Sequence, residues 1–377
     1  MGRAHTRAWT QGRVTMARLD HAEFRVYRLP YVRPVRWADT AEDGALFVLL
    51  RLVGDNGAVG VSEVTVKPTW NGMTPRSLIS SVEDLLLPRV RECDLDDPVA
   101  VRRMLDSVPE NTAGKALVDN ACWDLAAAGR REPLWRTWGG RADLPLSWAV
   151  TRQAPTAMGE EAIARVEEFG FRTLKVKGGQ GIETDLEAMR AIRSAVGDDV
   201  ELYVDANGAY AAGEAREYVQ RMAEAGAVVV EDPCAIAPNN AFSELQASSP
   251  VPILVDFNCT SLNDSRLFIE RGALALSLKP GRLGLTDTYE MARLAQARGL
   301  RTVVGLFGES LLGSLTALQL ASTLPSTSLP AEVTWYLAMN AQILPDGISI
   351  RGGKLALPDC SSIASLVDWG LVERYAP

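Results

Sequence analysis

Short apolar runs that end in a lysine or an acidic residue recur along the middle of this chain. They are Thr173–Lys177, Tyr203–Asn207, Val230–Pro233, Ile253–Asp256 and Leu276–Pro280. Their spacing of about 25 residues is the repeat expected of strand–helix units in a parallel barrel. Because the carboxyl ends of all strands in such a barrel meet at one mouth, we expect the polar residues to converge there. The sequence therefore predicts a barrel with a charged mouth.

Three carboxylates end three successive runs, namely Asp205, Glu231 and Asp256. A single acid in such a place often caps a helix or pairs with an arginine. Asp232 is interpreted as stabilising a helix N-terminus, with support of the metal ligands as the alternative. Three acids that converge repel one another unless a cation joins them. Oxygen ligands without a thiolate or an imidazole favour Mg²⁺, or alternatively Mn²⁺. We therefore predict that the three acids bind one divalent ion.

Lysines flank these three acids. Lys175 and Lys177 are two residues apart on one predicted strand, so their side chains share a face. Adjacent ammonium groups disfavour each other's charge, which predicts the lowered lysine pKa that a general base needs. Lys279 ends the run that follows Asp256, on the far side of the predicted ion from Lys177. These parts suit removal of a proton α to a carboxylate, because a bound metal stabilises the enediolate as a Lewis acid.

Composition excludes several other classes of protein. The 377 residues carry a formal net charge of −8, which argues against a nucleic-acid partner. The only histidines, His5 and His21, precede the repeat, so catalysis in the barrel cannot depend on histidine. Five scattered cysteines without Cys-x-x-Cys spacing suggest neither a zinc site nor disulfides, and they indicate the cytoplasm. No apolar run is long enough to span a bilayer, so no membrane partner is expected.

The two ends of the chain lie outside the repeat. Strand-like patterns surround the turn Gly54–Gly57, and helical patterns follow from Pro75 to Ala128. We predict an α+β capping domain over residues 16–143, completed by residues from about 346 to 377, and a (β/α) barrel over residues 144–345. The first and eighth barrel strands are predicted at Leu144–Val150 and roughly at Glu332–Leu337. Residues 1–15 are polar and are predicted to be disordered.

Taken in order, the motifs resemble the enolase superfamily, and within it the muconate lactonizing enzyme subgroup (mandelate racemase/muconate cycloisomerase-like). The resemblance begins at Leu19 and includes Lys-Val-Lys, Asp-Ala-Asn, Glu-Asp-Pro, Asp256 and Lys279. It also includes Trp123-Asp-Leu and Trp138-Gly-Gly140. The lack of a barrel histidine is unlike the mandelate racemase subgroup. The resemblance implies an α/β fold, with a TIM-type (β/α)7β barrel and an α+β capping domain.

The resemblance also implies roles for individual residues. Asp205, Glu231 and Asp256 look like the Mg²⁺ ligands, and Lys177 and Lys279 like paired acid/base residues. Lys175 is similar to the lysine that orients the substrate carboxylate. Further candidates for substrate binding, or for support of the ligands, are Asn207, Glu309, Glu332 and Trp70. The resemblance implies a homo-oligomer.

Two departures from the family pattern bear on these expectations. Phe257 and Asn258 follow Asp256, where the family more often has an acidic residue. The segment Pro330–Leu337 lacks the paired aspartates that dipeptide epimerases use for a substrate ammonium. It is more similar to the Glu-containing eighth strand of cycloisomerases, with Glu332 in that place.

We therefore expect an isomerase that abstracts a proton α to the carboxylate of a small substrate and gives an enediolate. The outcome is cycloisomerisation of the muconate-lactonizing type, or racemisation or epimerisation. A dehydratase of the o-succinylbenzoate synthase type uses the same residues and stays open. Two other classes stay open as well: a lyase with a Schiff base on Lys279, and a non-catalytic metal-binding barrel. The sequence does not identify the substrate.

Overall fold

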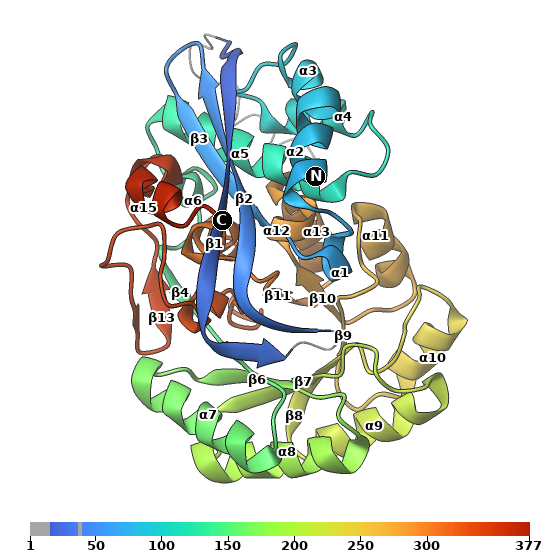
Figure 1. The fold of residues 1–377 in the computed structure, drawn as a ribbon. Coiled ribbons are helices and arrows are strands. Elements are labelled where there is room, and N and C mark those ends of the chain that lie inside the picture. Colours follow the sequence, from blue (N-terminus) through green and yellow to red (C-terminus); the bar gives the residue numbers. More distant parts are fainter. Residues whose placement is uncertain (1–15, 37–39) are drawn as a thin grey trace.

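An antiparallel sheet stands across one end of a parallel sheet that is ringed by helices (Figure 1). The computed structural model describes residues 16–36 and 40–377, so the prediction for residues 1–15 lies outside the described residues. The predicted class, an α/β barrel with an α+β cap, is confirmed. Among the described residues, no helix is both long enough and apolar enough to cross a membrane.

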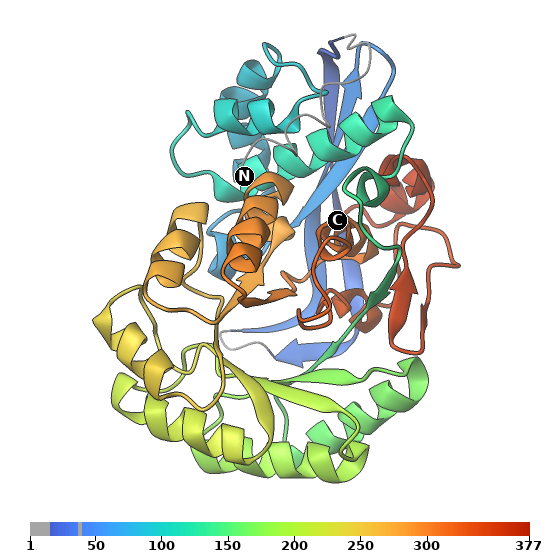
Figure 2. The same cartoon turned by 180° about the vertical axis from the view of Figure 1, so that it is seen from behind.

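The antiparallel sheet has the strand order β1–β2–β3. The strands are β1 Leu19–Arg36, β2 Ala41–Gly54 and β3 Val59–Thr65. The turn predicted between the last two is present, and Gly57 has a φ of 80°, in the left-handed region that favours glycine. Helices cover one face of this sheet (Figure 2). The helical segments of this part of the chain are α1 Pro68–Asn71, α2 Pro75–Ser81, a π-helical turn at Val82–Leu86, α3 Leu87–Val90, α4 Pro98–Leu105, α5 Thr112–Arg130 and α6 Leu134–Thr137, of which α2 and α5 contact the sheet most.

Helix α5 joins the cap to the barrel. Every residue from Ala113 to Ala127 is buried, because the helix packs against β3 on one side and against barrel helices on the other. A Cβ atom on Gly60 would overlap the carbonyl oxygen of Ala121, so β3 needs glycine where α5 crosses it. The absence of a side chain at Gly60 therefore sets how closely α5 approaches β3.

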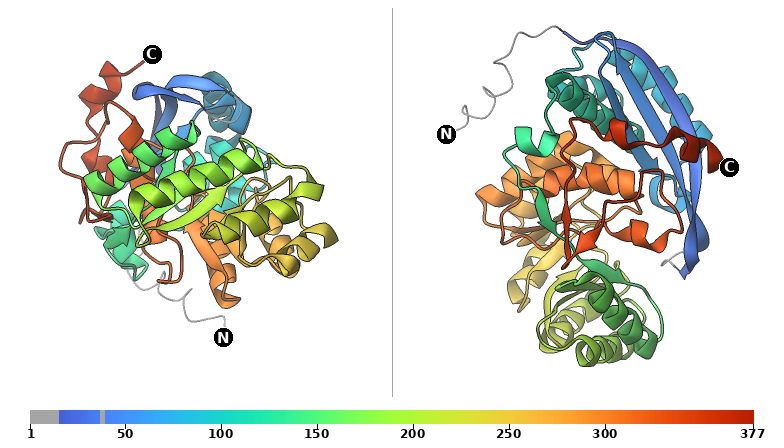
Figure 3. Two further views of the ribbon diagram at one scale, coloured as in Figure 1. Left: turned by 90° about the horizontal axis from the view of Figure 1, so that it is seen from below. Right: turned by 90° about the vertical axis from the view of Figure 1, so that its left-hand side faces the viewer.

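Seven parallel strands follow one another around the barrel in the order β5 to β11. They are β5 Trp148–Val150, β6 Thr173–Lys177, β7 Glu201–Asp205, β8 Ala227–Glu231, β9 Ile253–Val255, β10 Ala275–Leu278 and β11 Arg301–Val304. Helices cover the outside (Figure 3, left). The barrel helices are α7 Pro155–Phe169, α8 Ile182–Val196, α9 Ala212–Glu224, α10 Asn240–Ser248, α11 Leu262–Glu270, α13 Leu285–Ala297 and α14 Leu311–Ala321, and a short helix, α12 Pro280–Leu283, follows β10 at the end that faces α5.

The eighth barrel position differs from the prediction. An extended segment, residues 329–332, bridges β11 and β5: Leu329 N donates to Thr302 O at 2.8 Å, and Ser147 N donates to Ala331 O at 2.9 Å. The predicted strand from Glu332 to Leu337 is wrong, because residues 335–338 form a 3₁₀ helix, η2 (Trp335–Ala338). The Thr334 hydroxyl donates to the Ser147 carbonyl oxygen at 2.8 Å, so a side chain takes an acceptor that a continuing strand would use.

The C-terminal residues contact both parts of the molecule. Strands β12 (Ile350–Arg351) and β13 (Lys354–Ala356) form a sheet with β4 (Asp143–Pro145), so the predicted strand Leu144–Val150 is split between two sheets. A 3₁₀ helix, η3 (Ile363–Leu366), and α15 (Trp369–Arg374) then return to the cap. Arg28 N on β1 donates to Tyr375 O at 2.8 Å, and α15 lies beside β1 (Figure 3, right).

Candidate active site

The carboxyl ends of five successive strands bring the predicted lysines and acids together. Lys175 and Lys177 lie on β6, Asp205 ends β7, Glu231 ends β8, Asp256 follows β9 and Lys279 follows β10. In the strand register, Lys177 is level with Asp205, and Asp205 is level with Glu231. The apolar runs end at one height, so their final polar residues share one mouth.

Lys175 is the most enclosed of the lysines, with 2% of its surface exposed. Its Nζ lies 2.7 Å from Glu231 Oε2, 3.1 Å from Asp205 Oδ2 and 3.2 Å from Glu332 Oε2. Burial lowers the pKa of Lys175, but the three carboxylates more than offset burial and raise this pKa well above its ordinary value. The prediction that neighbouring ammonium groups lower the lysine pKa is therefore wrong for Lys175. Lys175 therefore stays protonated and positively charged.

Lys177 lies at the more open side of the mouth. Its Nζ donates to Asp205 Oδ2 at 2.7 Å and to Asn207 Oδ1 at 3.4 Å. Asn207 has a φ of 50°, a left-handed conformation that asparagine tolerates. In this conformation its backbone N donates to Asp205 Oδ1 at 2.8 Å and its Nδ2 to Asp205 Oδ2 at 3.0 Å. Asn207 therefore supports the carboxylate that Lys177 contacts.

Lys279 forms the matching pair on the other side, where its Nζ donates to Asp256 Oδ2. Arg282, which the sequence analysis missed, lies on α12 one turn after Lys279 and donates from Nη2 to the Asp256 carbonyl oxygen at 3.0 Å. Burial raises the pKa of Asp256, but Lys279 and then Arg282 outweigh burial and hold it well below its ordinary value. Lys175 and Lys177 do the same for the pKa of Asp205 against its burial. Both acids therefore stay ionised.

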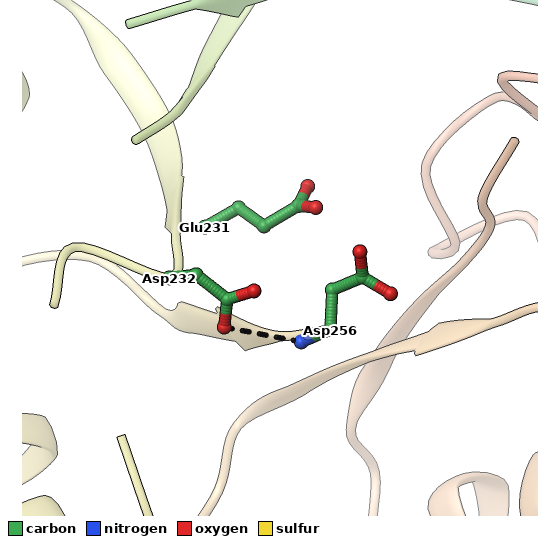
Figure 4. A group of neighbouring side chains, drawn as sticks. All are labelled: Glu231, Asp232 and Asp256. Carbon is green, nitrogen blue, oxygen red and sulfur yellow. Dashed lines mark hydrogen bonds between the residues drawn. The ribbon is translucent and has the colours of Figure 1, made fainter. Parts of the chain in front are cut away.

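A group of three acids could hold a metal ion, and its membership differs in part from the prediction. Glu231, Asp232 and Asp256 each present an oxygen within 4.8 Å of the other two (Figure 4). Asp205 is not a member of this group, because its oxygens face Lys175, Lys177 and Asn207. Asp232 does not stabilise a helix N-terminus as predicted. It has a φ of 39° and accepts from Phe257 N at 2.7 Å and from Asp256 N at 3.2 Å.

The chemistry of these acids fits a cation with oxygen ligands. Glu231 is fully buried, and its Oε1 accepts no hydrogen bond from any described residue. Burial first, and then Asp205, raises the pKa of Glu231 well above its ordinary value. Burial and the neighbouring Asp256 raise the pKa of Asp232 to about 7. Lys175 is the cation next to Glu231, but it is shared with Asp205 and Glu332, so these buried carboxylates outnumber the positive charge beside them. A hard divalent ion such as Mg²⁺ would supply the missing charge.

Glu332 and Glu309 line the other side of the mouth. Glu332, from the segment that closes the barrel, is 1% exposed and accepts from Lys175, from Leu306 N at 3.4 Å and from the Tyr203 hydroxyl. Glu309 Oε2 accepts from Phe307 N at 2.7 Å, and burial raises the pKa of Glu309 to about 7. The sequence analysis missed Tyr203, because it reads as one more apolar residue of a strand.

Trp70, on α1 of the cap, lies at the edge of the barrel mouth. Its ring lies 5.5 Å from the ring of Phe307 in the loop after β11, and Lys67 Nζ stands 4.4 Å from its ring centroid. Trp70, Lys67 and Gly308 line one cavity of about 260 Å³ between the cap and this loop. Of the four additional candidates, Asn207 and Glu332 therefore contact the lysine and acid group directly, whereas Glu309 and Trp70 both contact Phe307 in the loop after β11.

The chain matches two family models over most of its length. Residues 157–361 match the model described as "Enolase C-terminal domain-like", and residues 22–139 match "Mandelate racemase / muconate lactonizing enzyme, N-terminal domain". Chloromuconate cycloisomerase CbnB of Cupriavidus necator is 26% identical over 92% of this chain and 96% of its own. N-succinylamino acid racemase of Thermus thermophilus is 28% identical over 95% of this chain and 97% of its own.

Solved structures show the same architecture. The muconate lactonizing enzyme from Mycobacterium smegmatis, in complex with muconolactone, superposes with a TM-score of 0.90 and 25% identity. The match covers 96% of this chain and all (100%) of that one. The cap and the barrel are therefore shared as one unit with that enzyme.

Proposed function

Because the chain belongs to the mandelate racemase/muconate lactonizing enzyme family of the enolase superfamily, we propose that it is a Mg²⁺-dependent isomerase of small carboxylates. The reaction begins with removal of the proton α to the carboxylate. One observation carries this proposal. Lys177 on β6 and Lys279 after β10 flank the three strands that hold the acids, and each lysine is bonded to a different acid.

Each side chain has a distinct task in this proposal. In racemisation, Lys177 and Lys279 take or return a proton from opposite sides of the substrate carbon, whereas in cycloisomerisation one of them moves the proton and the other stabilises the developing charge. Lys175, a permanent cation inside the barrel, binds the substrate carboxylate. The metal ligands are Glu231 and Asp256, with either Asp205, as predicted from the sequence, or Asp232, as in the observed group. A bound Mg²⁺ would supply Lewis-acid stabilisation of the negative charge that develops on the substrate.

Cycloisomerisation of the muconate-lactonizing type is the favoured reaction. The chloromuconate cycloisomerase and the muconate lactonizing enzyme among the relatives support it, and so does a single glutamate, Glu332, at the eighth barrel position. Racemisation of an N-acylated amino acid is the second candidate. The N-succinylamino acid racemase supports it, as does the arrangement of two lysines on opposite sides of the acids.

Exchange of the α-proton with D₂O tests the proposal. We expect the wild-type protein with Mg²⁺ to exchange this proton on muconolactone or on an N-succinylamino acid, observed by ¹H NMR. The Lys177→Ala, Lys279→Ala double variant should not exchange it. Absence of exchange on both substrate types would overturn the proposal. A borohydride-dependent mass increase on Lys279 in the presence of a carbonyl compound would show a Schiff-base lyase instead.

We also propose that the enzyme is a cytoplasmic homo-oligomer. All five cysteines are free thiols, which agrees with a reducing compartment. Light scattering after size-exclusion chromatography tests the assembly, and a single-chain mass of 40.8 kDa in solution would contradict it.

A further inference from the structure

An apolar layer fills the barrel beneath the charged mouth, and one of its members carries a hydroxyl. The layer consists of Tyr203, Val229, Leu254, Ala275, Val303 and Leu329, all buried. Five of these six side chains are aliphatic. Tyr203 lies two residues before Asp205 on β7, so both side chains point to the same face of the strand, and its ring is fully buried.

The Tyr203 hydroxyl points from this layer to the mouth. It donates to Glu332 Oε1, across the barrel from β7. The other oxygen, Oε2, accepts from Lys175 Nζ at 3.2 Å and from Leu306 N at 3.4 Å. Tyr203 and Lys175 therefore hold the two ends of one buried carboxylate.

Packing alone does not explain a tyrosine here. Phenylalanine would fill the same space with its ring, as the aliphatic members of the layer fill theirs. The hydroxyl is useful because a buried carboxylate oxygen without a donor is costly. Without it, Glu332 has one empty oxygen and is free to turn, and Lys175 loses the fixed position of one of its three anionic partners.

We propose that Tyr203 is a positioning residue that acts through Glu332 to hold the Lys175 ammonium where the substrate carboxylate binds. The inference rests on the proposed function, because it takes Lys175 as the carboxylate-binding group. It adds a residue from below the mouth to the machinery of the site. The chain is Tyr203 hydroxyl, Glu332 carboxylate and Lys175 ammonium, each bonded to the next.

Tyr203→Phe tests the proposal with Tyr336→Phe as its matched control. Tyr336 is also a buried tyrosine, but its hydroxyl bonds to no described residue. With muconolactone and N-succinylphenylalanine as probes, we expect Y203F to raise KM for α-proton exchange by about tenfold, the effect of losing one hydrogen bond to a charged group, with a smaller change in kcat. Y336F should change KM less than about twofold.

A double-mutant cycle separates action through Glu332 from packing. In the Glu332→Gln background, we expect Tyr203→Phe to add little, because the carboxylate that transmits its effect is gone. A full tenfold effect in that background would overturn the proposal, as would equal KM values for Y203F and Y336F. If Y203F does not fold, E332Q alone decides: it should raise KM by about the same factor, and an unchanged KM would overturn the inference.

Failure of the inference is distinguishable from failure of the proposed function. If wild-type protein exchanges no α-proton, both are overturned, and a thermal-unfolding cycle over the same variants still reports whether Tyr203 and Glu332 interact. If wild-type protein exchanges the proton and Y203F behaves like Y336F, the inference alone is overturned.

Discussion

The barrel mouth and helix α5 both bury acidic side chains, but they stabilise them in opposite ways. At the mouth, Asp205 and Asp256 meet lysine ammonium groups, which hold their pKa values well below the ordinary range against the effect of burial. On α5, Asp124 accepts from Ile363 N at 2.7 Å and Val61 N at 2.9 Å, and Asp119 accepts from Thr286 N at 2.8 Å. Burial raises both of these pKa values to about 6.

The acids at the mouth serve the proposed chemistry, whereas the acids on α5 hold parts of the fold together. On α5, Asp124 connects segments far apart in the sequence through neutral donors, and its protonation leaves those contacts possible, whereas Asp119 also has the Arg102 guanidinium nearby. At the mouth, Asp205 and Asp256 are kept ionised by cations that include the two proposed acid/base lysines, Lys177 and Lys279. A substitution at the mouth should therefore change catalysis and metal binding, whereas one on α5 should change stability and its pH dependence.

The strongest test of this comparison replaces the lysines. If the enzyme racemises its substrate, Lys177→Ala should lower exchange of one enantiomer by about 10³-fold, and Lys279→Ala should lower exchange of the other, since general bases contribute factors of this size. If it cycloisomerises, one lysine moves the proton and the other stabilises charge, so only one replacement should abolish exchange. ¹H NMR in D₂O measures both. Full activity of the double variant would show that neither lysine takes part in the reaction.

The pH dependence of stability should follow α5. Because the folded-state pKa of Asp124 is about 6 and its ordinary value is 3.8, the folded protein binds more protons than the unfolded chain between these values. Stability from this residue is thus present below about pH 4 and is lost as pH rises to 6, by about 3 kcal/mol in total. In Asp124→Asn, urea unfolding at several pH values should show a shallower decline. A decline as steep as in wild type would contradict the assignment.

Mouth acids should show the opposite sign. This holds for Asp205 and Asp256, whose folded-state pKa values lie below the ordinary one, so their contribution is present at neutral pH and is lost as pH falls through the acidic range. In an Asp256→Asn variant, the free energy of unfolding should therefore fall less at acidic pH than in wild type. Its decline as pH rises toward 6 should be unchanged. The two variants together separate the two regions in one type of measurement.

Metal affinity should depend on the mouth alone. Glu231→Gln should weaken Mg²⁺ binding by about 100-fold, because it removes an anionic oxygen from a buried site, while Asp124→Asn should leave binding unchanged. Isothermal calorimetry gives both affinities. Comparing Asp205→Asn with Asp232→Asn then decides the third ligand, since the variant of the true ligand should weaken binding more. Equal affinity in wild type and E231Q would refute the site.

Most of the mouth could be predicted from the sequence because it depends on local patterns. A polar residue at the end of an apolar strand lies at the mouth whatever the rest of the chain does, which placed Lys175, Lys177 and Lys279. The orientation of a side chain depends on the neighbours that fold against it. The Asp232 side chain points toward Glu231 and Asp256 because its φ is 39°, a backbone conformation that the sequence pattern does not predict.

The missed contacts are long-range. Tyr203 meets Glu332 across 129 positions of sequence, and the side chain alone gives no sign of its partner. The eighth barrel strand was misjudged for a similar reason. Its apolar residues continue past Glu332, but the Thr334 hydroxyl takes a backbone acceptor of residue 147 and ends the extended segment. Hydrophobic pattern predicts which residues are buried, whereas hydrogen-bond competition decides the conformation in which they are buried.

The smallest predicted effect on activity distinguishes the Lys177 side of the mouth from the Lys279 side. A Cβ atom on Gly305 would lie 3.0 Å from Lys279 Cε and would overlap Ser277 Oγ, so Gly305→Ala should displace the Lys279 side chain and leave Lys177 in place. We expect about a tenfold loss of the exchange that depends on Lys279, the order of effect that a displaced catalytic group produces, and little change in the exchange that depends on Lys177. Gly213→Ala on α9 is the control, because a Cβ atom there meets nothing within 4 Å. Equal losses on both sides in G305A would mean that the lysines do not act separately, and the comparison between the two faces of the substrate would have to be abandoned.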